Sequence, residues 1–350
     1  MYNKNMKDLW NYLKETNKPI VLYGMGDGAD KIISVLNSKN IKISGVFASD
    51  NFVRNKTFGG FPVTNYKTAK AAFPDMIVLL CFGTALPDVI NNIKNIASEC
   101  EFYAPDVPVS GGPVFDADFY KENEDKINAA RKVLADSASI KTFDNIIEYK
   151  LSGDINKLFS CETGNEEIYD IFDVKGNKCF VDLGAYRGDT VIDFVNRVEA
   201  YDRIIAAEPD EKTFVKLKKN TENLKNITLI NAAVSDKTGI MYFDKKASRG
   251  SHLVKRESEK SIAAFSLDSL GLFGDNVYIK ADIEGAEADF INGAKDTIKN
   301  LKPSIRIAAY HKSEDIFSIP LKVLAINPDY KVYLRHNPCL PAWDTDYFFI

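Results

Sequence analysis

Residues 181–190, which read VDLGAYRGDT, limit the possible folds of this chain more than any other segment. They combine a short apolar run, a carboxylate, a loop with two glycines and the start of an amphipathic stretch that continues to Val198. This order is typical of a strand, a tight turn and a helix in an open α/β sheet, where ligands bind outside the carboxyl end of the strand. The segment therefore predicts a ligand-binding strand–loop–helix unit.

The charge of this loop indicates which ligand it suits. Between Gly184 and Gly188, Tyr186 stands where the dinucleotide motif has its middle glycine. Asp182 would repel a pyrophosphate and attract a cation. A cofactor with a positive sulfonium, S-adenosylmethionine, fits that charge better than NAD. The candidate cofactor-binding residues of the loop are Asp182, Gly184, Ala185, Gly188 and Asp189.

Composition excludes several classes of protein. A chain of 350 residues with 45% hydrophobic content is long enough for two domains, each with its own core. The formal net charge of −4 offers no basic field for nucleic acid. The five cysteines lack the spacing of a zinc site or of a secreted disulfide scaffold. No apolar run has the length of a signal peptide core or of a membrane span, so we expect a cytoplasmic protein.

The pattern along the chain predicts three parts. Residues 1–110 alternate between strand-like and helical segments and predict a small Rossmann-like α/β domain. Residues 111–172 are charge-rich and helical, and we expect a connector that caps the cleft of the next domain. Residues 173–350 predict a second, larger α/β domain. The strands expected in the first part are 20–23, 43–47 and 76–82, which supply only half of a dinucleotide-binding fold.

The last part contains seven candidate strands, at 179–183, 203–207, 227–232, 277–281, 304–309, 331–334 and 347–350. The first five alternate with helical or mixed segments, as parallel βαβ units do. The last two are close in sequence, so one of them should run antiparallel. Residues 240–243 and 263–267 predict an inserted hairpin. This inventory fits the seven-stranded Rossmann-like sheet of class I S-adenosylmethionine-dependent methyltransferases.

Glu208, in the motif AAEPD, ends the strand that follows the glycine loop. In nucleotide-binding sheets an acid at this place accepts hydrogen bonds from ribose hydroxyls. The other interpretation is an acid at a helix N-terminus, because Asp210 and Glu211 begin the next helical segment. Together with the glycine loop, the ribose role is favoured.

Residues 278–287, YIKADIEGAE, form a third motif in which an apolar strand delivers Asp282 to the carboxyl edge of the sheet. That place faces the methyl group of the cofactor in this architecture. Methyl transfer from a sulfonium is an in-line displacement, so the protein positions the acceptor and assists its deprotonation. We expect Asp282 to be catalytic, whereas Glu287 is expected only to favour the start of a helix.

These motifs, with LDSL (267–270), FINGA (290–294), LKP (301–303) and NAAVSDKTG (231–239), resemble the FkbM-type methyltransferases in kind and order. The resemblance covers roughly the second half of the chain. Residues 135–154 and 308–320 are also similar to a bacterial subset associated with surface polysaccharides. What this implies is an O-methyltransferase that acts on a hydroxyl of a nucleotide-linked sugar or glycan precursor in polysaccharide biosynthesis. By the same resemblance Asn231, Ala232 and Ala233 should line the adenine pocket.

The chain departs from that family where the fifth strand ends. Many members have Glu there, but this chain has Tyr310 and His311. We expect His311 near Asp282, and His336 at the end of the next strand within reach of the same cleft. In one interpretation Asp282, His311 and His336 hold a divalent cation that lowers the pKa of the acceptor hydroxyl. In the other, His311 is a general base and His336 a structural residue.

Two further segments allow a second function. Residues 245–256 concentrate Lys and Arg around Arg249 and His252, either as a solvated loop or as a contact for the phosphates of a sugar nucleotide. The candidate substrate-binding residues are Arg249, His252 and Tyr310.

The N-terminal motif GMGDGA (24–29) follows the dinucleotide pattern, with Asp50 after the second strand. We expect a degenerate module used for packing or homodimer formation. The alternatives are an NAD(P)- or nucleotide-sugar-binding enzyme and a non-catalytic sensor.

Overall fold

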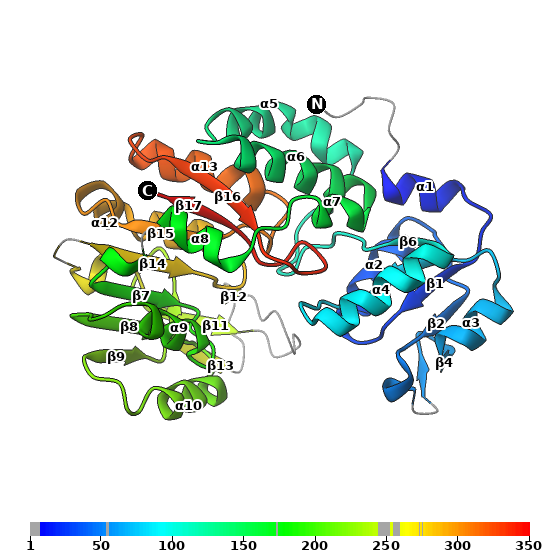
Figure 1. The fold of residues 1–350 in the computed structure, drawn as a ribbon, viewed down its shortest axis with the longest axis horizontal. Helices are drawn as coiled ribbons and strands as arrows, with labels where there is room; N and C mark the ends of the chain where they lie inside the picture. Colours follow the sequence, from blue (N-terminus) through cyan, green and yellow to red (C-terminus); the bar gives the residue numbers. More distant parts are fainter. Residues whose placement is uncertain are drawn as a thin grey trace.

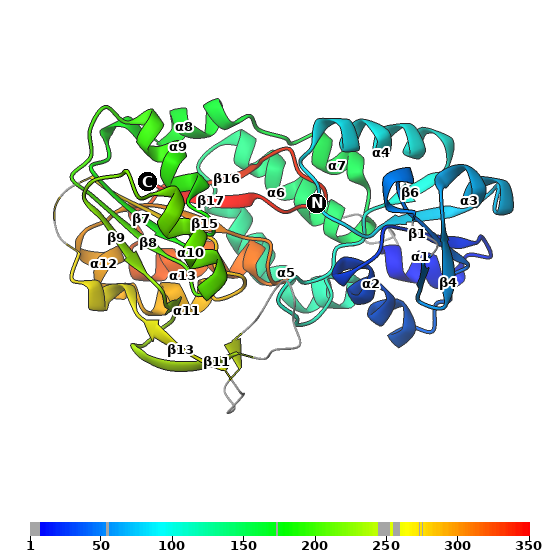
Figure 2. The same cartoon turned by 90° about the horizontal axis from the view of Figure 1, so that it is seen from below.

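The computed structural model describes residues 8–53, 56–172, 174–243, 253–254, 260–272, 274 and 276–350. Two α/β parts lie side by side, and helices from the middle of the chain lie along one side of the molecule (Figures 1 and 2). Within the described ranges, no helix is both long and apolar enough to cross a membrane. The mixed α/β architecture expected from the sequence is confirmed.

The N-terminal part is built on a six-stranded sheet in the order β3-β4-β2-β1-β5-β6. All neighbouring strands pair in parallel except β3 and β4, which form a hairpin. The sequence predicted β1, β2 and β5, which are fully buried, but it missed β3, β4 and β6, which are partly exposed. The strands are β1 (Ile20–Tyr23), β2 (Gly45–Phe47), β3 (Thr57–Phe58), β4 (Phe61–Thr64), β5 (Ile77–Leu80) and β6 (Glu101–Tyr103). The helices are α1 (Leu9–Glu15), α2 (Asp27–Ser38), α3 (Tyr66–Ala72), α4 (Pro87–Glu99) and the 3-10 turn η1 (Asp50–Phe52).

Four helices follow, and they pack beside the C-terminal sheet. They are α5 (Ala117–Lys132), α6 (Ser137–Ser152), α7 (Ile155–Phe159) and α8 (Asn165–Phe172). Helix α6 lies along the edge strand β16 (Val332–His336), and Arg335 of that strand donates to the carboxylate of Asp136, the N-cap of α6. Helix α5 packs on α13 (Asp315–Ile326). These helices therefore share the core of the C-terminal part, while the boundaries 1–110, 111–172 and 173–350 stay a prediction.

The C-terminal part contains the expected seven-stranded sheet, in the order β16-β17-β15-β14-β7-β8-β9. Strand β17 pairs antiparallel with both β15 and β16, which confirms that one of the last two strands is reversed. Besides β16, the strands are β7 (Cys179–Leu183), β8 (Arg203–Ala207), β9 (Ile227–Ile230), β14 (Val277–Ala281), β15 (Ser304–Ala308) and β17 (Thr345–Phe349). The remaining helices are α9 (Asp189–Arg197), α10 (Glu211–Asn220), α11 (Glu287–Asn292) and α12 (Lys295–Asn300), with the 3-10 turns η2 (Val174–Gly176) and η3 (Leu267–Leu270).

A second, smaller sheet in the order β10-β13-β11-β12 lies beside the large one. Its strands are β10 (Ala233–Val234), β11 (Gly239–Phe243), β12 (Leu253–Val254) and β13 (Lys260–Phe265). The antiparallel pair β11–β13 is the inserted hairpin that the sequence predicted. The expected strand 227–232 instead ends at Ile230, and the chain then enters the small sheet as β10.

The centre of the large sheet is buried on both faces, as in other parallel sheets. All five residues of β7 and of β14 are buried, yet these two strands contain Asp182 and Lys280 among their apolar residues. Charged side chains at the centre of a sheet cost free energy unless they are paired. Asp182 and Lys280 lie near the carboxyl ends of β7 and β14, so this edge of the sheet is a candidate functional site.

Candidate active site

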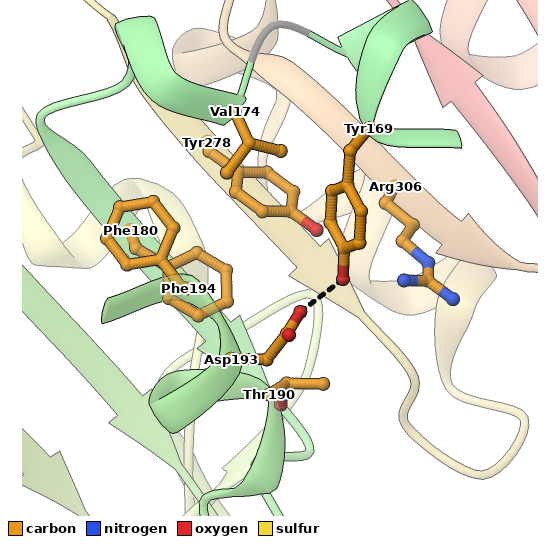
Figure 3. A pocket seen from close by; sticks show the side chains of 8 residues that line it. All are labelled: Tyr169, Val174, Phe180, Thr190, Asp193, Phe194, Tyr278 and Arg306. Carbon is orange, nitrogen blue, oxygen red and sulfur yellow. Dashed lines mark hydrogen bonds between the residues drawn. The ribbon is translucent and has the colours of Figure 1, made fainter. Parts of the chain in front are cut away.

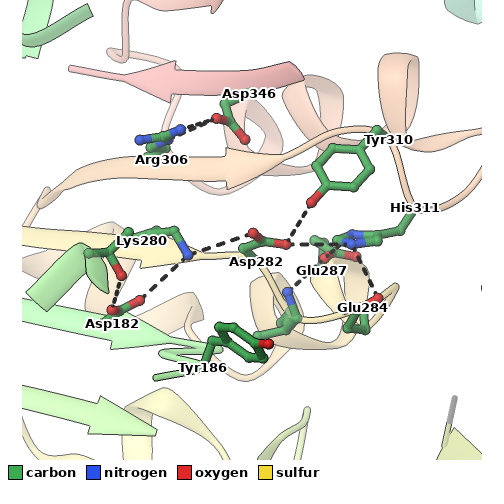
Figure 4. Close-up of polar contacts among 12 residues, drawn as sticks. Asp182, Tyr186, Lys280, Asp282, Glu284, Glu287, Arg306, Tyr310, His311 and Asp346 are labelled. Atoms are coloured by element: carbon green, nitrogen blue, oxygen red, sulfur yellow. Dashed lines mark hydrogen bonds and ion pairs between the residues drawn. The ribbon is translucent and has the colours of Figure 1, made fainter. Parts of the chain in front are cut away.

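The loops that follow β7, β8, β14 and β15 meet at one edge of the large sheet, because these four strands are parallel neighbours. This carboxyl edge is where open α/β sheets bind ligands. It brings together Gly184 after β7, Glu208 after β8, Asp282 after β14, and Tyr310 and His311 after β15. Figure 4 shows several of these side chains converging around Asp282.

Gly184 brings two of these loops into contact. Its φ is +82°, and a Cβ added there would lie 1.9 Å from the carbonyl oxygen of Asp282. Gly188 (φ +88°) precedes the first residue of α9 and packs against the side chain of Leu217, where a Cβ would come within 2.9 Å. The two-glycine loop is therefore set by close packing against neighbouring elements as well as by its positive φ angles.

Asp182 is fully buried, and its carboxylate is engaged by other side chains. One oxygen accepts a hydrogen bond from Thr190 at the start of α9, and the other lies 3.6 Å from the Lys280 amine. Burial raises the pKa of Asp182, with Lys280 acting in the opposite direction. The negative charge that the sequence assigned to the cofactor loop is thus paired with Lys280 inside the protein. The exposed residues of the loop are Tyr186, Arg187 and Asp189.

Glu208 lies at the end of β8, 8% exposed, and its carboxylate faces the glycine loop. It accepts backbone N–H bonds from Tyr186 (3.0 Å) and Asp210 (2.8 Å). Burial raises the pKa of Glu208 to about 7, although these two N–H groups act against the shift. Asn231 donates to the carbonyls of Glu208 and Pro209, so it fixes the turn that carries this carboxylate. Ala232 and Ala233, expected beside Asn231, are buried there.

Asp282 is the partly open carboxylate of the edge, with its side chain 32% exposed. One oxygen accepts a hydrogen bond from the Tyr310 hydroxyl at 3.1 Å, and the other lies 3.7 Å from the Lys280 amine. Burial opposes its ionisation, but Lys280 and then His311 outweigh burial and hold the pKa of Asp282 below its usual value. Asp282 is therefore an ionised hydrogen-bond acceptor at neutral pH.

His311 is buried among carboxylates. Its Nδ1 lies 2.8 Å from Glu287, and its Nε2 lies 3.5 Å from Asp282 and 3.6 Å from Glu284. Burial disfavours the charged ring, but Glu287, followed by Asp282 and Glu284, raises the pKa of His311 to about 10. In this arrangement the ring is a cation with both N–H groups directed at carboxylates, so it has no free nitrogen with which to accept a proton or bind a metal.

Glu287 has more partners than a residue that only starts a helix. It is fully buried at the first position of α11, and it accepts N–H bonds from Ile283 and Gly285 as well as facing His311. The loop it closes includes Glu284 and Gly285, both with positive φ. Glu287 therefore shapes the loop that presents Asp282, which agrees with the structural role expected for it and adds the pairing with His311.

The N-terminal part also touches this loop. Ser110 donates its backbone N–H to the His311 carbonyl at 3.1 Å and its hydroxyl to the Glu284 carbonyl at 2.5 Å. A Cβ at Gly285 would come within 2.6 Å of Ser110, so these two segments of the chain are in close contact. Lys31 of α2 donates to the Val109 carbonyl beside this contact. The segment that joins the two parts therefore holds the Asp282 loop in place.

His336 lies apart from this cluster. It is fully buried at the end of β16, where its Nδ1 is 2.9 Å from the Thr345 hydroxyl. Burial lowers the pKa of His336 to about 4, so the ring is neutral. No three His, Cys, Asp or Glu side chains gather into a possible metal site within the described parts of the chain. The metal centre expected from Asp282, His311 and His336 is therefore not formed.

A small pocket lies between helices α8 and α9 and strands β7, β14 and β15 of the large sheet (Figure 3). The Tyr169 hydroxyl of α8 donates to Asp193 of α9 across this pocket, and the Arg197 guanidinium lies 3.6 Å from the centre of the Tyr169 ring. Its lining residues are Tyr169, Val174, Phe180, Thr190, Asp193, Phe194, Tyr278 and Arg306. Four aromatic rings line it, and Thr190, which donates to Asp182, links it to the carboxyl edge.

Two candidate residues, Arg249 and His252, lie outside the described residues. The sequence also missed Lys280, although it stands two residues before Asp282 and alternation places both on one face of the sheet. Ser110 gave no comparable signal, since it is 174 residues from its partner Glu284.

Comparison with known proteins agrees with this geometry. Residues 182–333 match the sequence model of the methyltransferase FkbM domain. The C-terminal part of the chain is an FkbM methyltransferase domain. The chain is thus an S-adenosylmethionine-dependent methyltransferase, as the sequence predicted. A search of curated proteins gave no match.

Solved structures extend the likeness to the whole fold. Methyltransferase FkbM from Methylobacillus flagellatus KT is 18% identical and has a TM-score of 0.71, with 95% of this chain and 90% of that chain covered. The shared fold thus includes the N-terminal sheet. Fibrillarin from Aeropyrum pernix, solved with bound S-adenosyl-L-methionine, is 12% identical over 51% of this chain and 68% of its own, with a TM-score of 0.33. A putative O-methyltransferase from Klebsiella pneumoniae is 10% identical over 65% of this chain and 95% of its own, with a TM-score of 0.33.

Proposed function

We propose that this FkbM-type methyltransferase transfers a methyl group to a hydroxyl of a sugar, on a nucleotide-linked sugar or a glycan precursor, in polysaccharide biosynthesis. The observation that carries the proposal is Asp282, a partly exposed carboxylate at the carboxyl edge of β14 that the protein keeps ionised. An ionised carboxylate accepts a hydrogen bond from a neutral hydroxyl, which is the group that a sugar offers.

The residues of this edge fit the methyl donor. The Glu208 carboxylate receives one backbone N–H on each oxygen and keeps further lone pairs for two hydroxyl donors, which matches a ribose diol. Gly184 lets the glycine loop lie directly against the Asp282 loop, because any side chain at this position would meet the Asp282 carbonyl. When bound, the donor supplies a methyl group on a positively charged sulfur, and this carbon–sulfur bond breaks as the acceptor oxygen bonds to the methyl carbon.

The protein's own contribution is to orient the acceptor hydroxyl and to take its proton. Asp282 accepts the hydrogen bond and then the proton, while Tyr310 and Lys280 hold the carboxylate in one orientation. A base with a lowered pKa is sufficient here, because the hydroxyl becomes strongly acidic as its oxygen bonds to the methyl carbon. His311 supports this step as a cation that keeps Asp282 ionised.

The experiment is mass spectrometry of candidate acceptors after incubation with the protein and S-adenosylmethionine. A panel of sugar nucleotides and methyl glycosides is expected to contain at least one compound that gains one methyl group. The variant Asp282→Asn is expected to reduce the rate by at least about 100-fold, within the usual range for loss of a general base. A methylated product formed equally well by Asp282→Asn would refute this role of Asp282, and methylation of a non-sugar acceptor alone would refute the substrate class.

The glycine loop of the N-terminal part leaves a second function open. Gly24 and Gly26 have φ values of +110° and +109°, and a Cβ at Gly28 would lie 2.4 Å from the Cys81 carbonyl. The loop thus has the tight turn and the close helix–strand contact that dinucleotide motifs need. However, Asp27 lies in the first turn of α2 and Asp50 is exposed. Binding of NAD(P) or a sugar nucleotide at this loop, and formation of a homodimer, stay predictions.

A further inference from the structure

The loop between β16 and β17 crosses from the C-terminal part to the N-terminal part. In Figure 1 this loop, in red, extends towards the blue and cyan elements. Leu340 exchanges two backbone hydrogen bonds with Thr84, of 2.7 and 2.9 Å. The indole of Trp343 lies directly on Gly83, where an added Cβ would be 2.0 Å from a ring carbon. Only a glycine at position 83 leaves space for this ring.

Gly83 follows β5, at the carboxyl edge of the N-terminal sheet. The chain leaves β1 towards β2 on one side and reaches β5 on the other, so the strand order reverses between β1 and β5. Open sheets bind their ligands at such a reversal. Phe82, the residue before Gly83, packs against Gly24 of the glycine loop. Trp343 therefore lies where an N-terminal ligand would bind, although it belongs to the methyltransferase domain.

The next residue, Asp344, lies opposite Tyr310 at the end of the β15–β17 pair, because Ala308 pairs with Asp346 and Ala309 donates its backbone N–H to the Thr345 carbonyl at 2.9 Å. Asp344 has a φ of +55°, and burial, together with Asp346 and Asp282, raises its pKa to about 6. Asp344 and Asp282 also both raise the pKa of Tyr310, whose hydroxyl binds Asp282. The loop consequently places Asp344 opposite Tyr310, which binds Asp282, and carries the Trp343 ring on the preceding residue.

Exposure and charge indicate what this surface accepts. Trp343 is 37% exposed, whereas the other tryptophan, Trp10, is 2% exposed, so the indole keeps an open face. Ligand sites commonly combine such aromatic faces with a few polar groups that fix orientation. Asp344, the residue after the indole, carries a carboxylate that repels a phosphate and accepts hydrogen bonds from hydroxyls. A neutral sugar ring suits both features, because its C–H face packs on an indole and its hydroxyls donate to carboxylates.

We propose that Trp343 is the residue that recognises the sugar ring of the acceptor, with Asp344 accepting hydrogen bonds from its hydroxyls and Gly83 keeping the indole in position. This assignment rests on the proposed sugar methyltransferase function and names the side chain that selects the acceptor. The N-terminal sheet then contributes to acceptor recognition by holding the loop, through Gly83 and Thr84, and not by binding a nucleotide.

Ligand-observed saturation-transfer NMR without methyl donor tests this assignment. The probes are methyl glycosides of glucose, galactose, mannose, N-acetylglucosamine, rhamnose and fucose, with UDP as the nucleotide probe. At least one glycoside is expected to receive saturation from the wild-type protein. Trp343→Ala is expected to lose this signal and Trp343→Phe to keep part of it. Gly83→Ala, which displaces the indole, is expected to weaken it, whereas Gly164→Ala, which adds a methyl group in open space, is expected to leave it unchanged.

The assignment is overturned if no glycoside receives saturation, if Trp343→Ala binds as wild type does, or if only UDP binding depends on Trp343. Kinetics then separate it from the proposed function. With a methylated acceptor in hand, Trp343→Ala is expected to raise KM at least about tenfold, the equivalent of 1.4 kcal/mol, with little change in kcat. A methylated product with unchanged KM contradicts the Trp343 assignment alone. Glycoside binding that needs Trp343, without any methylated product, contradicts the methyl-transfer proposal alone.

Discussion

Replacement of Gly184 by alanine tests whether the cofactor loop and the Asp282 loop depend on each other. Gly184 has a φ of +82°, and the added Cβ would lie 1.9 Å from the Asp282 carbonyl oxygen and 2.9 Å from its carbonyl carbon. Both atoms belong to the backbone, so no side-chain rotation relieves the contact. The loop that presents Asp282 must move, or the glycine loop must leave its position.

The structure provides a matched control that separates backbone strain from this contact. Gly60, in the β3–β4 turn, has a φ of +85° and no atom within 4 Å of an added Cβ. Gly60→Ala should therefore cost only the left-handed conformation, about 1–2 kcal/mol. Gly184→Ala should cost the same amount plus about 1–3 kcal/mol for overpacking. The expected difference in the free energy of unfolding is about 1–3 kcal/mol.

Urea unfolding followed by circular dichroism measures the two free energies, and calorimetric titration measures affinity for S-adenosylmethionine. Gly184→Ala is expected to be the less stable variant and to bind the donor at least about tenfold more weakly, since a shift equal to 1.4 kcal/mol is tenfold. Gly60→Ala is expected to bind as wild type does. Equal stability and equal donor affinity in the two variants would show that the predicted contact does not exist.

Two further predictions concern ionisable groups. Because the pKa of Glu208 is raised to about 7, its carboxylate is protonated at lower pH, and wild-type affinity for S-adenosylmethionine should increase from pH 6 to pH 8. Glu208→Gln should remove this pH dependence and weaken binding by about 1.5–3 kcal/mol, as titration calorimetry at both pH values would reveal. The pKa of His311 is raised to about 10, so its charge stabilises the fold fully below pH 6.5 and this contribution is lost as pH rises through 10. Glu287→Gln should lower the free energy of unfolding by about 3 kcal/mol at pH 7. The variant should also lose less of this free energy than wild type as the pH rises towards 10. Urea unfolding that shows the same pH profile for both proteins would contradict the pairing of His311 with Glu287.

The fold was largely predictable because its signals are local. Strands β7, β8 and β14 have the expected bounds, since each is a short apolar run bordered by turn residues. Strands β3, β4 and β6 escaped prediction, because they are partly exposed and lack the continuous apolar run of β1 and β5. The strand expected at 227–232 was two residues too long and β10 was not predicted, because the point at which a chain changes sheets depends on pairing partners and not on local apolarity.

The candidate site was predictable in position but not in its charges. Glu208 and Asp282 were found because each follows a strand whose carboxyl end lies at the ligand edge. The sequence offered His311 as a base or a metal ligand, since an isolated imidazole has a pKa near neutrality. Its three carboxylate partners convert it into a cation, and their arrangement depends on the loop that Glu287 closes.

The sequence by itself determined the two α/β sheets, the glycine loop and the order of the motifs that define the methyltransferase domain. The signals for these features lie in residues that are neighbours in sequence, because the alternation of apolar side chains and the position of glycine determine local structure. Only the tertiary structure decided that Lys280 neutralises Asp182, that Ser110 holds the Asp282 loop and that Trp343 lies on Gly83. Ionisation and side-chain contacts depend on burial and on distances through space, and the packing of remote segments sets both.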